Sequence, residues 1–223
     1  MAIQLLIGYI GEGNTDERFI PELINKVFCE LAVECHNDVM IEDVRSIEKC
    51  GGSFEEVMLD AAKQSYELGL SILCVHSDAD SPKISTTIKN KFDPFLHALS
   101  LCKDTTHCKN IVKIIPIQET EAWMLADKKL FKEKINAKGR TDNDLGINKQ
   151  PELFSDPKGT IEEAIRIAQS NRPKRRRREL SISDLYDELG RSISIERLQT
   201  IPSFCAFEES AKEALKSLGY IRI

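Results

Sequence analysis

The chain has 223 residues, enough for one sizeable hydrophobic core or for a core domain with a small appendage. Its 30% charged and 41% hydrophobic residues are ordinary for a globular protein. The net charge of −5 neither indicates nor excludes nucleic-acid binding, because a local basic strip is enough to follow phosphates. No apolar run approaches the roughly 18 residues of a membrane-spanning helix. The N-terminus lacks a basic stretch before its short apolar run, so we expect no signal peptide and a cytoplasmic protein.

The first half of the sequence predicts alternating strands and helices. Residues 4–10 form a near-continuous apolar run, which predicts a buried strand, and Thr15 has the position of an N-cap for a helix that ends near residue 31. Residues 39–47 alternate well enough for a second strand. Ser53 is expected to cap the next helix, which Gly69 ends. The further expected elements are strands at 70–75 and 111–117, a helix at 84–101 that is interrupted near Pro94, and a helix at 121–126.

This order predicts an α/β protein whose sheet is mainly parallel, with helices on both faces. The pattern changes after Asp127, which we interpret as a charge at a helix end. Residues 138–149 are polar and rich in Gly, Asn and Asp, which predicts a mobile loop. Three later segments are helical in pattern: 159–170, 183–189 and 205–218. We therefore expect residues 1–139 to form the main domain and residues 140–223 a small helical C-terminal extension.

The seven cysteines are scattered, and an odd, irregular set is typical of reduced thiols rather than of a disulfide framework. Two groupings leave a zinc site open as an alternative: Cys29 with Cys35 and His36, and Cys102 with His107 and Cys108. The close C-x2-C pairs of zinc modules are absent. We expect buried or unreactive thiols, as in a cytosolic protein.

Acidic residues follow three of the expected strands, at the end where open α/β sheets bind their ligands. The six carboxylates belong to Glu12 and Asp16, to Asp78 and Asp80, and to Glu119 and Glu121. The last two pairs are spaced by two residues, so in extended chain both carboxylates of a pair face the same side. Carboxylates crowded into a partly dry crevice repel one another unless a cation binds, and Mg²⁺ or Mn²⁺ prefers oxygen ligands. The six residues therefore predict a divalent-metal site.

Each cluster also has a plainer interpretation. Glu12 lies between two glycines, which allow close approach of a ligand, so its carboxylate is a candidate metal ligand or general base; equally, it can lie in an ordinary polar turn. Asp78 and Asp80 can belong to an acidic surface loop. His76 is expected to be a hydrogen-bonding residue rather than a ligand. The joint occurrence of three clusters is what favours the metal site.

The same residues carry a resemblance to a known fold. Glu12-Gly13 after the first strand and Asp78-x-Asp80 after a later strand resemble the signature of the TOPRIM fold, which occurs in topoisomerases, DnaG-type primases and OLD-family nucleases. More specifically, the chain resembles a TOPRIM-like bacterial family of uncharacterised function that is often encoded beside ABC-type ATPases in phage-defence loci. The stretches that carry this resemblance are EGNTD (12–16), HSDAD (76–80), ETEAWMLAD (119–127), SDPKG (155–159) and IPSF (201–204).

The resemblance implies a TOPRIM-like metal-binding domain with two ions, Mg²⁺ or Mn²⁺, that clamp the attacking and leaving oxygens at a phosphodiester. Asp78 and Asp80, with Glu12 or Asp16, would hold one ion, and Glu119 with Glu121 would help to hold the second. Glu12, Asp78 and Asp80 are the catalytic candidates. Whether Asp16 or Glu17 faces the metal stays open at this point. Lys128 or Lys129 is a candidate for neutralising charge in the transition state.

The strongest positive feature is the basic run of Lys174, Arg175, Arg176, Arg177 and Arg178. Its arginine forks could bind a nucleic-acid backbone, and the run could equally dock on an acidic face of a partner. A solvated charge run is the plainer alternative. The sequence contains no P-loop pattern, so ATP hydrolysis by that route would have to come from a partner.

The acidic residues and the resemblance together lead us to three expected functions. The preferred one is a metal-dependent endonuclease that acts on nucleic acid, with DNA favoured over RNA, as the effector of an ATPase-coupled anti-phage defence system. The alternative is a non-catalytic TOPRIM-like subunit that binds a nucleic acid or the ATPase. A phosphatase that uses Asp78 and Asp80 ranks last, because its DxD motif usually follows the first strand of the sheet.

Overall fold

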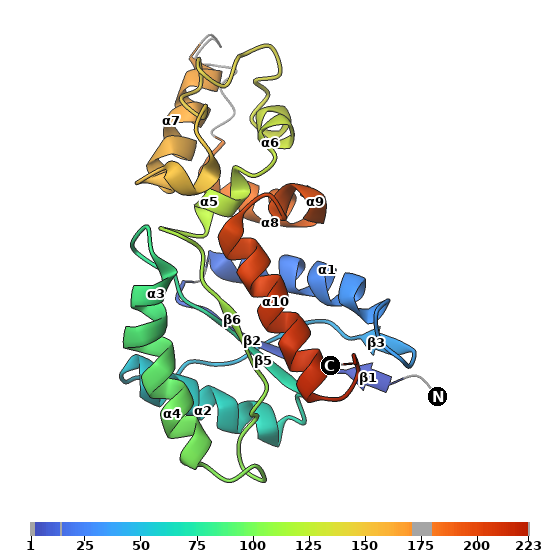
Figure 1. Ribbon diagram of the computed structural model, residues 1–223. Helices are drawn as coiled ribbons and strands as arrows, with labels where there is room; N and C mark the ends of the chain where they lie inside the picture. The colour runs from blue at the N-terminus through green and yellow to red at the C-terminus, as the bar shows by residue number, and fades with distance from the viewer. Residues whose placement is uncertain (1–2, 14, 171–179, 223) are drawn as a thin grey trace.

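The computed structural model describes residues 3–13, 15–170 and 180–222 (Figure 1). Every strand pairing among these residues is parallel. A two-stranded sheet joins β1 (Ile3–Leu5) to β3 (Val39–Ile41), and a four-stranded sheet has the order β4-β2-β5-β6. Its strands are β4 (Arg45–Ser46), β2 (Ile7–Ile10), β5 (Ile72–His76) and β6 (Ile111–Ile114). The predicted α/β class with a parallel sheet is confirmed.

Two of the expected strands are each divided between the two sheets. Residues 4–10 break at Leu6, whose carbonyl accepts a hydrogen bond from the backbone N–H of Ser71 at 2.8 Å. Residues 39–47 divide in the same way into β3 and β4. The single strand predicted for each run is therefore wrong, because the chain passes from one sheet to the other within it.

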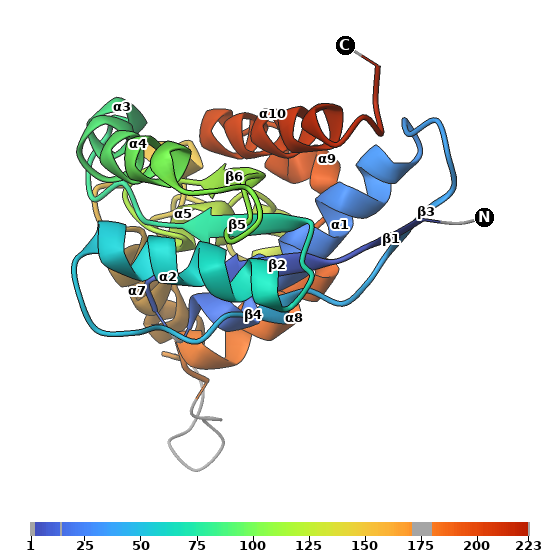
Figure 2. The same ribbon diagram turned by 90° about the horizontal axis from the view of Figure 1, so that it is seen from below.

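Alternate residues of the larger sheet face two different hydrophobic clusters. Tyr9 and Cys74 belong to a cluster that includes α1 (Ile20–Ala32) and the C-terminal helices. Ile10 and Val75 belong to a cluster with α2 (Phe54–Glu67) and α4 (Asp93–Leu101). Helices thus cover both faces, as expected. Figure 2 shows the strands in their sheet order, with α10 (Pro202–Ser217) beyond β6.

The helix boundaries follow local chemistry in most places. Ser53 and Glu56 form the capping box that begins α2, and Gly69 ends the segment with a φ of +71°. The Thr15 prediction is wrong: its side chain makes no cap hydrogen bond, and a 3-10 turn, η1 (Asp16–Arg18), precedes α1. Asp16 instead accepts the nearby hydrogen bond, from the backbone N–H of Gly13 at 3.1 Å.

The expected interruption near Pro94 takes the form of a π-helix. The chain runs from α3 (Ile84–Thr87) through the π-helix η2 (Ile88–Phe92) into α4. Pro94 lies in the first turn of α4, where its missing N–H matters least. A widened turn of this kind often coincides with a functional position.

The second half is helical, as its pattern predicts. Its α-helices are α5 (Glu121–Met124), α6 (Lys128–Lys134), α7 (Pro157–Gln169), α8 (Leu185–Ser192), α9 (Ile195–Leu198) and α10, with 3-10 turns η3 (Pro151–Leu153) and η5 (Ile182–Asp184). Asp127 caps α6 by accepting the N–H of Leu130 at 2.9 Å. The loop at 138–149 has no helix or strand, yet Leu145 and Ile147 are fully buried and anchor it.

One hydrophobic cluster joins the two halves of the chain. Trp123 is fully buried, packs edge-on against Phe204 with ring centroids 5.2 Å apart, and donates its indole N–H to Ser203 at 2.8 Å. Residues on both sides of the predicted boundary at 139 and 140 therefore share a core. That boundary stays a prediction, which truncation of the chain can test.

Two simpler expectations concern thiols and membranes. All seven cysteines are free thiols, as expected. Within the described ranges, no helix has both the length and the apolar character that crossing a membrane requires.

Candidate functional site

Asp78 is the centre of a group of carboxylates at the carboxyl ends of β2, β5 and β6. These strands run parallel, so the segments that follow them emerge at one edge of the sheet. Asp78 follows β5, and its Oδ1 accepts hydrogen bonds from the backbone N–H of Thr120 at 2.9 Å and from its hydroxyl at 3.2 Å. Its negative charge raises the pKa of three other carboxyl groups, those of Asp16, Glu119 and Glu121.

His76 connects two of these carboxylates from inside the protein. The imidazole is fully buried, with Nε2 3.3 Å from Asp78 Oδ1 and 3.0 Å from the Thr120 hydroxyl, and with Nδ1 3.7 Å from Asp16 Oδ2. Burial alone lowers the pKa of His76, but the hydrogen bond to Asp78 and the charges of Asp78, Asp16 and Glu12 raise it overall. His76 therefore balances negative charge at this edge of the sheet.

Asp16, and not Glu17, faces the group. The Asp16 side chain is buried while Glu17 is exposed, so the alternative left open by the sequence is decided by the 3-10 turn that carries both. Burial is the main cause of the raised pKa of Asp16, the charge of Asp78 adds to it, and His76 opposes it. A buried carboxyl group of this kind favours a proton or a cation.

Glu119, which is half-buried, and Glu121, which is buried, complete the group. Burial is the main cause of the raised pKa of both residues, and for Glu121 the charges of Glu119 and Asp78 add to it. Glu121 accepts a short hydrogen bond from the hydroxyl of Tyr186 on α8. Oε2 of Glu119 is buried and has no hydrogen-bond partner among the described residues. That oxygen is available to an additional donor or cation.

Glu12 lies at the exposed rim and is held by protein donors. Its Oε1 accepts hydrogen bonds from the Ser77 hydroxyl at 2.8 Å and from the Lys91 ammonium at 2.6 Å. The Lys49 ammonium binds the backbone carbonyl of Glu12 at 2.6 Å. Sequence reasoning missed both lysines, because nothing in the lysine-containing stretches around them distinguishes these two residues.

Three other sequence predictions fall outside this group. Asp80 is exposed, has a φ of +51°, and its carboxylate makes no hydrogen bond or ion pair with other described residues. Lys128 donates its ammonium to the carbonyl of Lys149 at 2.7 Å, and the role suggested for Lys128 or Lys129 stays a prediction. The basic run at 174–178 lies outside the described residues.

The donor set fits a hard divalent cation, although it is not arranged around one. Asp16, Asp78, Glu119 and Glu121 offer carboxylate oxygens in partly buried surroundings, and one of those oxygens is unpaired. In the described part of the chain, no three His, Cys, Asp or Glu side chains already stand as a ligand set, the two candidate zinc groupings included. Lys91 on Glu12 and Tyr186 on Glu121 account for part of this, because each occupies a carboxylate oxygen that a metal would use.

Comparison with known proteins places the chain in a family. Residues 11–210 match the family described as a domain of unknown function, DUF4276. The chain belongs to this family. No curated protein and no solved structure matches it. The matched stretch includes all six acidic residues, and the family description assigns them no activity.

Gly11 is expected to be indispensable for the packing beneath the acidic residues of this DUF4276 member. A Cβ at this position would collide with the hydroxyl of Tyr9, which is itself buried and without a partner among the described residues. We expect Gly11→Ala to lower the free energy of unfolding by about 1–3 kcal/mol. Adding Tyr9→Phe removes the hydroxyl but keeps the ring carbon that carried it, which the new Cβ also approaches too closely, so the double variant should recover only part of the loss in chemical denaturation. Equal stability of the single and double variants would contradict this packing.

Asp16 is expected to destabilise the protein at neutral pH. Its folded pKa is raised, so its contribution to stability is fully present below about pH 4 and is lost as the pH rises through the folded value. Asp16→Asn should therefore raise Tm at pH 8, and the gain should shrink toward pH 4. Scanning calorimetry at several pH values measures this. The exposed neighbour provides the control, Glu17→Gln, for which no gain is expected.

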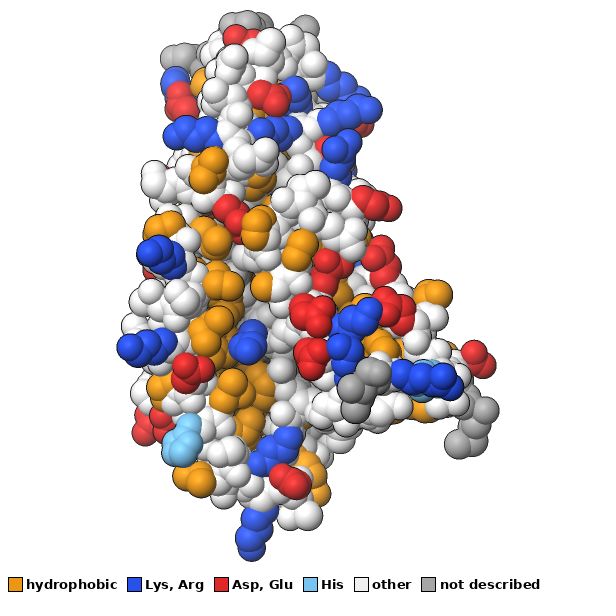
Figure 3. Space-filling model, in the orientation of Figure 1, with side chains coloured by type: hydrophobic (Ala, Val, Ile, Leu, Met, Phe, Trp, Pro, Cys, Tyr) orange, Lys and Arg blue, Asp and Glu red, His pale blue; other side chains and the backbone are white. Residues whose placement is uncertain are grey.

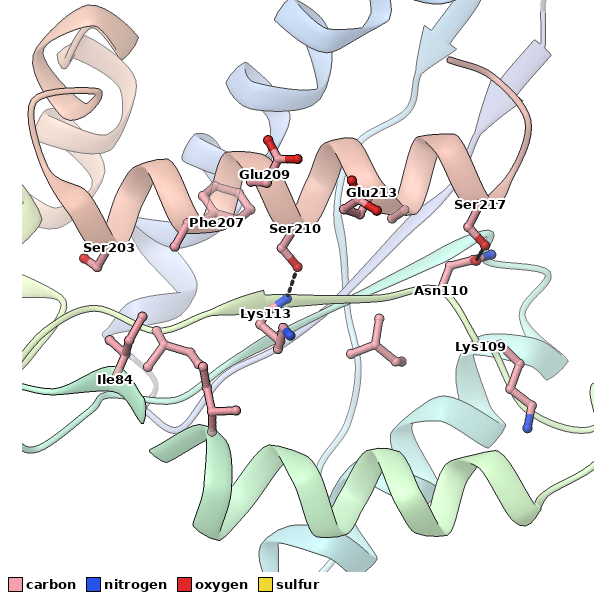
Figure 4. Close-up of a pocket in the computed structure, with 15 residues that line it drawn as sticks. Ile84, Lys109, Asn110, Lys113, Ser203, Phe207, Glu209, Ser210, Glu213 and Ser217 are labelled. Carbon is pink, nitrogen blue, oxygen red and sulfur yellow. Dashed lines mark hydrogen bonds between the residues drawn. The ribbon is translucent and has the colours of Figure 1, made fainter. Parts of the chain in front are cut away.

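A separate groove lies away from the carboxylates. It has a volume of about 490 Å³ and runs between α10, β6 and α3, where Figure 3 shows a band of hydrophobic side chains. In Figure 4 Lys113 of β6 donates its backbone N–H to the hydroxyl of Ser210 on α10, at 3.0 Å. None of the six predicted acidic residues lines this groove. The candidate site is therefore the carboxylate group around Asp78 and not this cavity.

Proposed function

We propose that the chain is a divalent-metal-dependent nuclease with a TOPRIM-like site. The observation that carries the proposal is the gathering of Asp16, Asp78, Glu119 and Glu121 at one edge of a parallel sheet, where burial and mutual repulsion raise the pKa of three of them. Such a group favours a bound cation over four separate charges. The TOPRIM resemblance, which Glu12-Gly13 and Asp78-x-Asp80 carry, supports a phosphodiester as the substrate.

The ligands would be these four residues together with Glu12, and Asp80 stays a predicted ligand at the exposed rim. A bound Mg²⁺ or Mn²⁺ would supply charge stabilisation at the phosphate and a more acidic water, and two ions are expected by resemblance. The remaining residues orient the ligands. Thr120 fixes Asp78 through two hydrogen bonds, and Ser77 fixes Glu12.

Nucleic acid, with DNA favoured over RNA, is the proposed substrate, and an ABC-type ATPase is the proposed partner in an anti-phage defence system that acts in the cytoplasm. The acidic surface at the rim would repel phosphates unless cations intervene. The basic run at 174–178 is the proposed contact for the nucleic-acid backbone. The absence of a P-loop pattern from the sequence supports a partner as the source of ATP hydrolysis.

One observation favours a second candidate, the non-catalytic binding subunit. Glu12 is neutralised by Lys91, Asp78 interacts with His76, and Glu121 is hydrogen-bonded by Tyr186, so protein groups satisfy much of the acidic cluster. In that case the carboxylates would stabilise the fold and the chain would only hold a nucleic acid or the ATPase.

A cleavage assay distinguishes the two candidates. Purified protein is incubated with supercoiled plasmid, single-stranded DNA and total RNA, with Mg²⁺, with Mn²⁺ or with a chelator. Each reaction is run with the protein alone and with ATP and the proposed ABC-type ATPase partner. We expect metal-dependent cleavage of at least one substrate. Cleavage that survives chelation would contradict the metal site. Binding without cleavage in every combination would favour the binding subunit.

A further inference from the structure

Lys91 occupies the position beside Glu12 that a cation would take. Its ammonium lies 2.6 Å from Oε1 of Glu12 and 2.8 Å from the hydroxyl of Ser77. The Ser77 hydroxyl donates to the same oxygen of Glu12, at 2.8 Å. Both hydrogen-bonding positions of Oε1 are therefore in use, and a metal ion that binds through this oxygen has to replace one of the two donors.

The local structure permits that replacement. The side chains of Glu12 and Lys91 are 38% and 31% exposed, so solvent and ions reach the pair. The ring of Phe54 lies with its centroid 5.8 Å from the Lys91 ammonium, a favourable contact that the ammonium can keep once Glu12 leaves it. Lys91 also belongs to the π-helix η2, whose next residue, Phe92, is fully buried and fixes the backbone.

We propose that Lys91 is a positioning residue that holds Glu12 in the metal-free protein and that a divalent cation displaces from it. This inference rests on the proposed metal-dependent function. Lys91 keeps Glu12 beside Ser77, the residue that precedes Asp78, and so prevents the carboxylate from turning out into solvent before the metal arrives. Metal binding then exchanges one cation for another at Glu12, so the ammonium and the metal compete for the same carboxylate.

Lys49 provides a matched control for this competition. Its ammonium is also directed at Glu12, but it binds the backbone carbonyl and not the carboxylate. Replacement of either lysine by methionine removes one positive charge near the site and keeps an unbranched side chain. Only the replacement at Lys91 removes a direct competitor for the carboxylate, so a difference between the two variants isolates the competition from the general change in charge.

The test is titration of the full chain with Mn²⁺. Isothermal titration calorimetry and the electron paramagnetic resonance signal of free Mn²⁺ each measure the dissociation constant. We expect Lys91→Met to lower the dissociation constant about tenfold, Lys49→Met to change it by about twofold or less, and Lys91→Arg to stay near the wild type. If Lys91→Met lowers the thermal stability too far, Lys91→Gln takes its place.

The outcomes separate this inference from the proposed function. An unchanged or weaker affinity in Lys91→Met, with clear Mn²⁺ binding by the wild type, would overturn the competition and leave the metal site standing. Equal tightening by Lys49→Met and Lys91→Met would also overturn it. Detectable Mn²⁺ binding by Lys91→Met, with none by the wild type or by Lys49→Met, would support the competition. No Mn²⁺ binding by the wild type or by any variant would overturn the metal site itself and the competition with it.

Discussion

Asp78→Asn is expected to reduce metal-dependent cleavage by about 10²-fold or more while the protein stays folded. Asp78 is the carboxylate whose charge reaches Asp16, Glu119 and Glu121, so its loss weakens the attraction of the whole group for a cation. Asparagine keeps an oxygen that can accept the hydrogen bonds of Thr120, which preserves the loop after β5. Initial cleavage rates and Mn²⁺ affinity, measured together, check the prediction.

Two further variants serve as comparisons for Asp78→Asn. Asp80→Asn should cause a smaller loss, since the Asp80 carboxylate is exposed and makes no contact with the described residues, although its spacing from Asp78 first suggested an equal role. Glu162→Gln, on the exposed side of α7, serves as the neutral control. Wild-type cleavage by Asp78→Asn would exclude the carboxylate group as the catalytic site, whatever the other two variants do.

The second large effect concerns the core that joins the two halves of the chain. Phe204 is fully buried and packs against both Trp123 and Phe207, with centroid distances of 5.2 and 5.6 Å. Phe204→Ala should lower the free energy of unfolding by about 3–5 kcal/mol, a large part of the stability of a typical domain. A fall in Tm of about 10 °C is expected. The exposed neighbour supplies the control, Ala206→Ser, which should change Tm little.

Truncation tests the same core and the predicted domain boundary together. A fragment of residues 1–139 keeps Trp123 but lacks Ser203, Phe204 and Phe207, its partners on α10. We expect this fragment to lack a cooperative thermal transition and to bind hydrophobic dyes. A cooperative transition in the fragment would instead support residues 1–139 as an independent domain.

The sequence predicted the sheet well because buried parallel strands have a strong local signature. Residues 70–75 and 111–117 are apolar runs between turn residues, and both contribute strands. The division of residues 4–10 at Leu6 had no such signature, because it depends on which distant segment pairs with each half. The Thr15 prediction was wrong for a local reason: Thr15 already has helical dihedral angles (φ −73°, ψ −36°) rather than the extended ones typical of an N-cap, and its side chain accepts no hydrogen bond from the turn that follows.

The candidate site shows the same limit. Strand-end positions led to Asp16, Asp78, Glu119 and Glu121, which the structure brings together around His76 and Thr120. Lys91 and Tyr186 were missed because each reaches the carboxylates from a helix far along the chain, and neither belongs to a motif. Asp80 illustrates the opposite error. Its two-residue spacing assumes extended backbone, and the left-handed conformation at Asp80 removes that geometry.

The hydrogen bond from Tyr186 to Glu121 has a consequence for the order in which the protein is made. Glu121 precedes its partner Tyr186 by 65 residues in the sequence. The nearby Trp123 precedes Ser203, which accepts its indole hydrogen bond, by 80 residues. Translation proceeds from the N-terminus, so all six acidic residues leave the ribosome before the helices that hold two of these contacts. The acidic group therefore reaches its final arrangement only after Tyr186 and Ser203 have been synthesised. The proposed site would therefore remain incomplete in the nascent chain until α8 and α10 have folded onto the sheet.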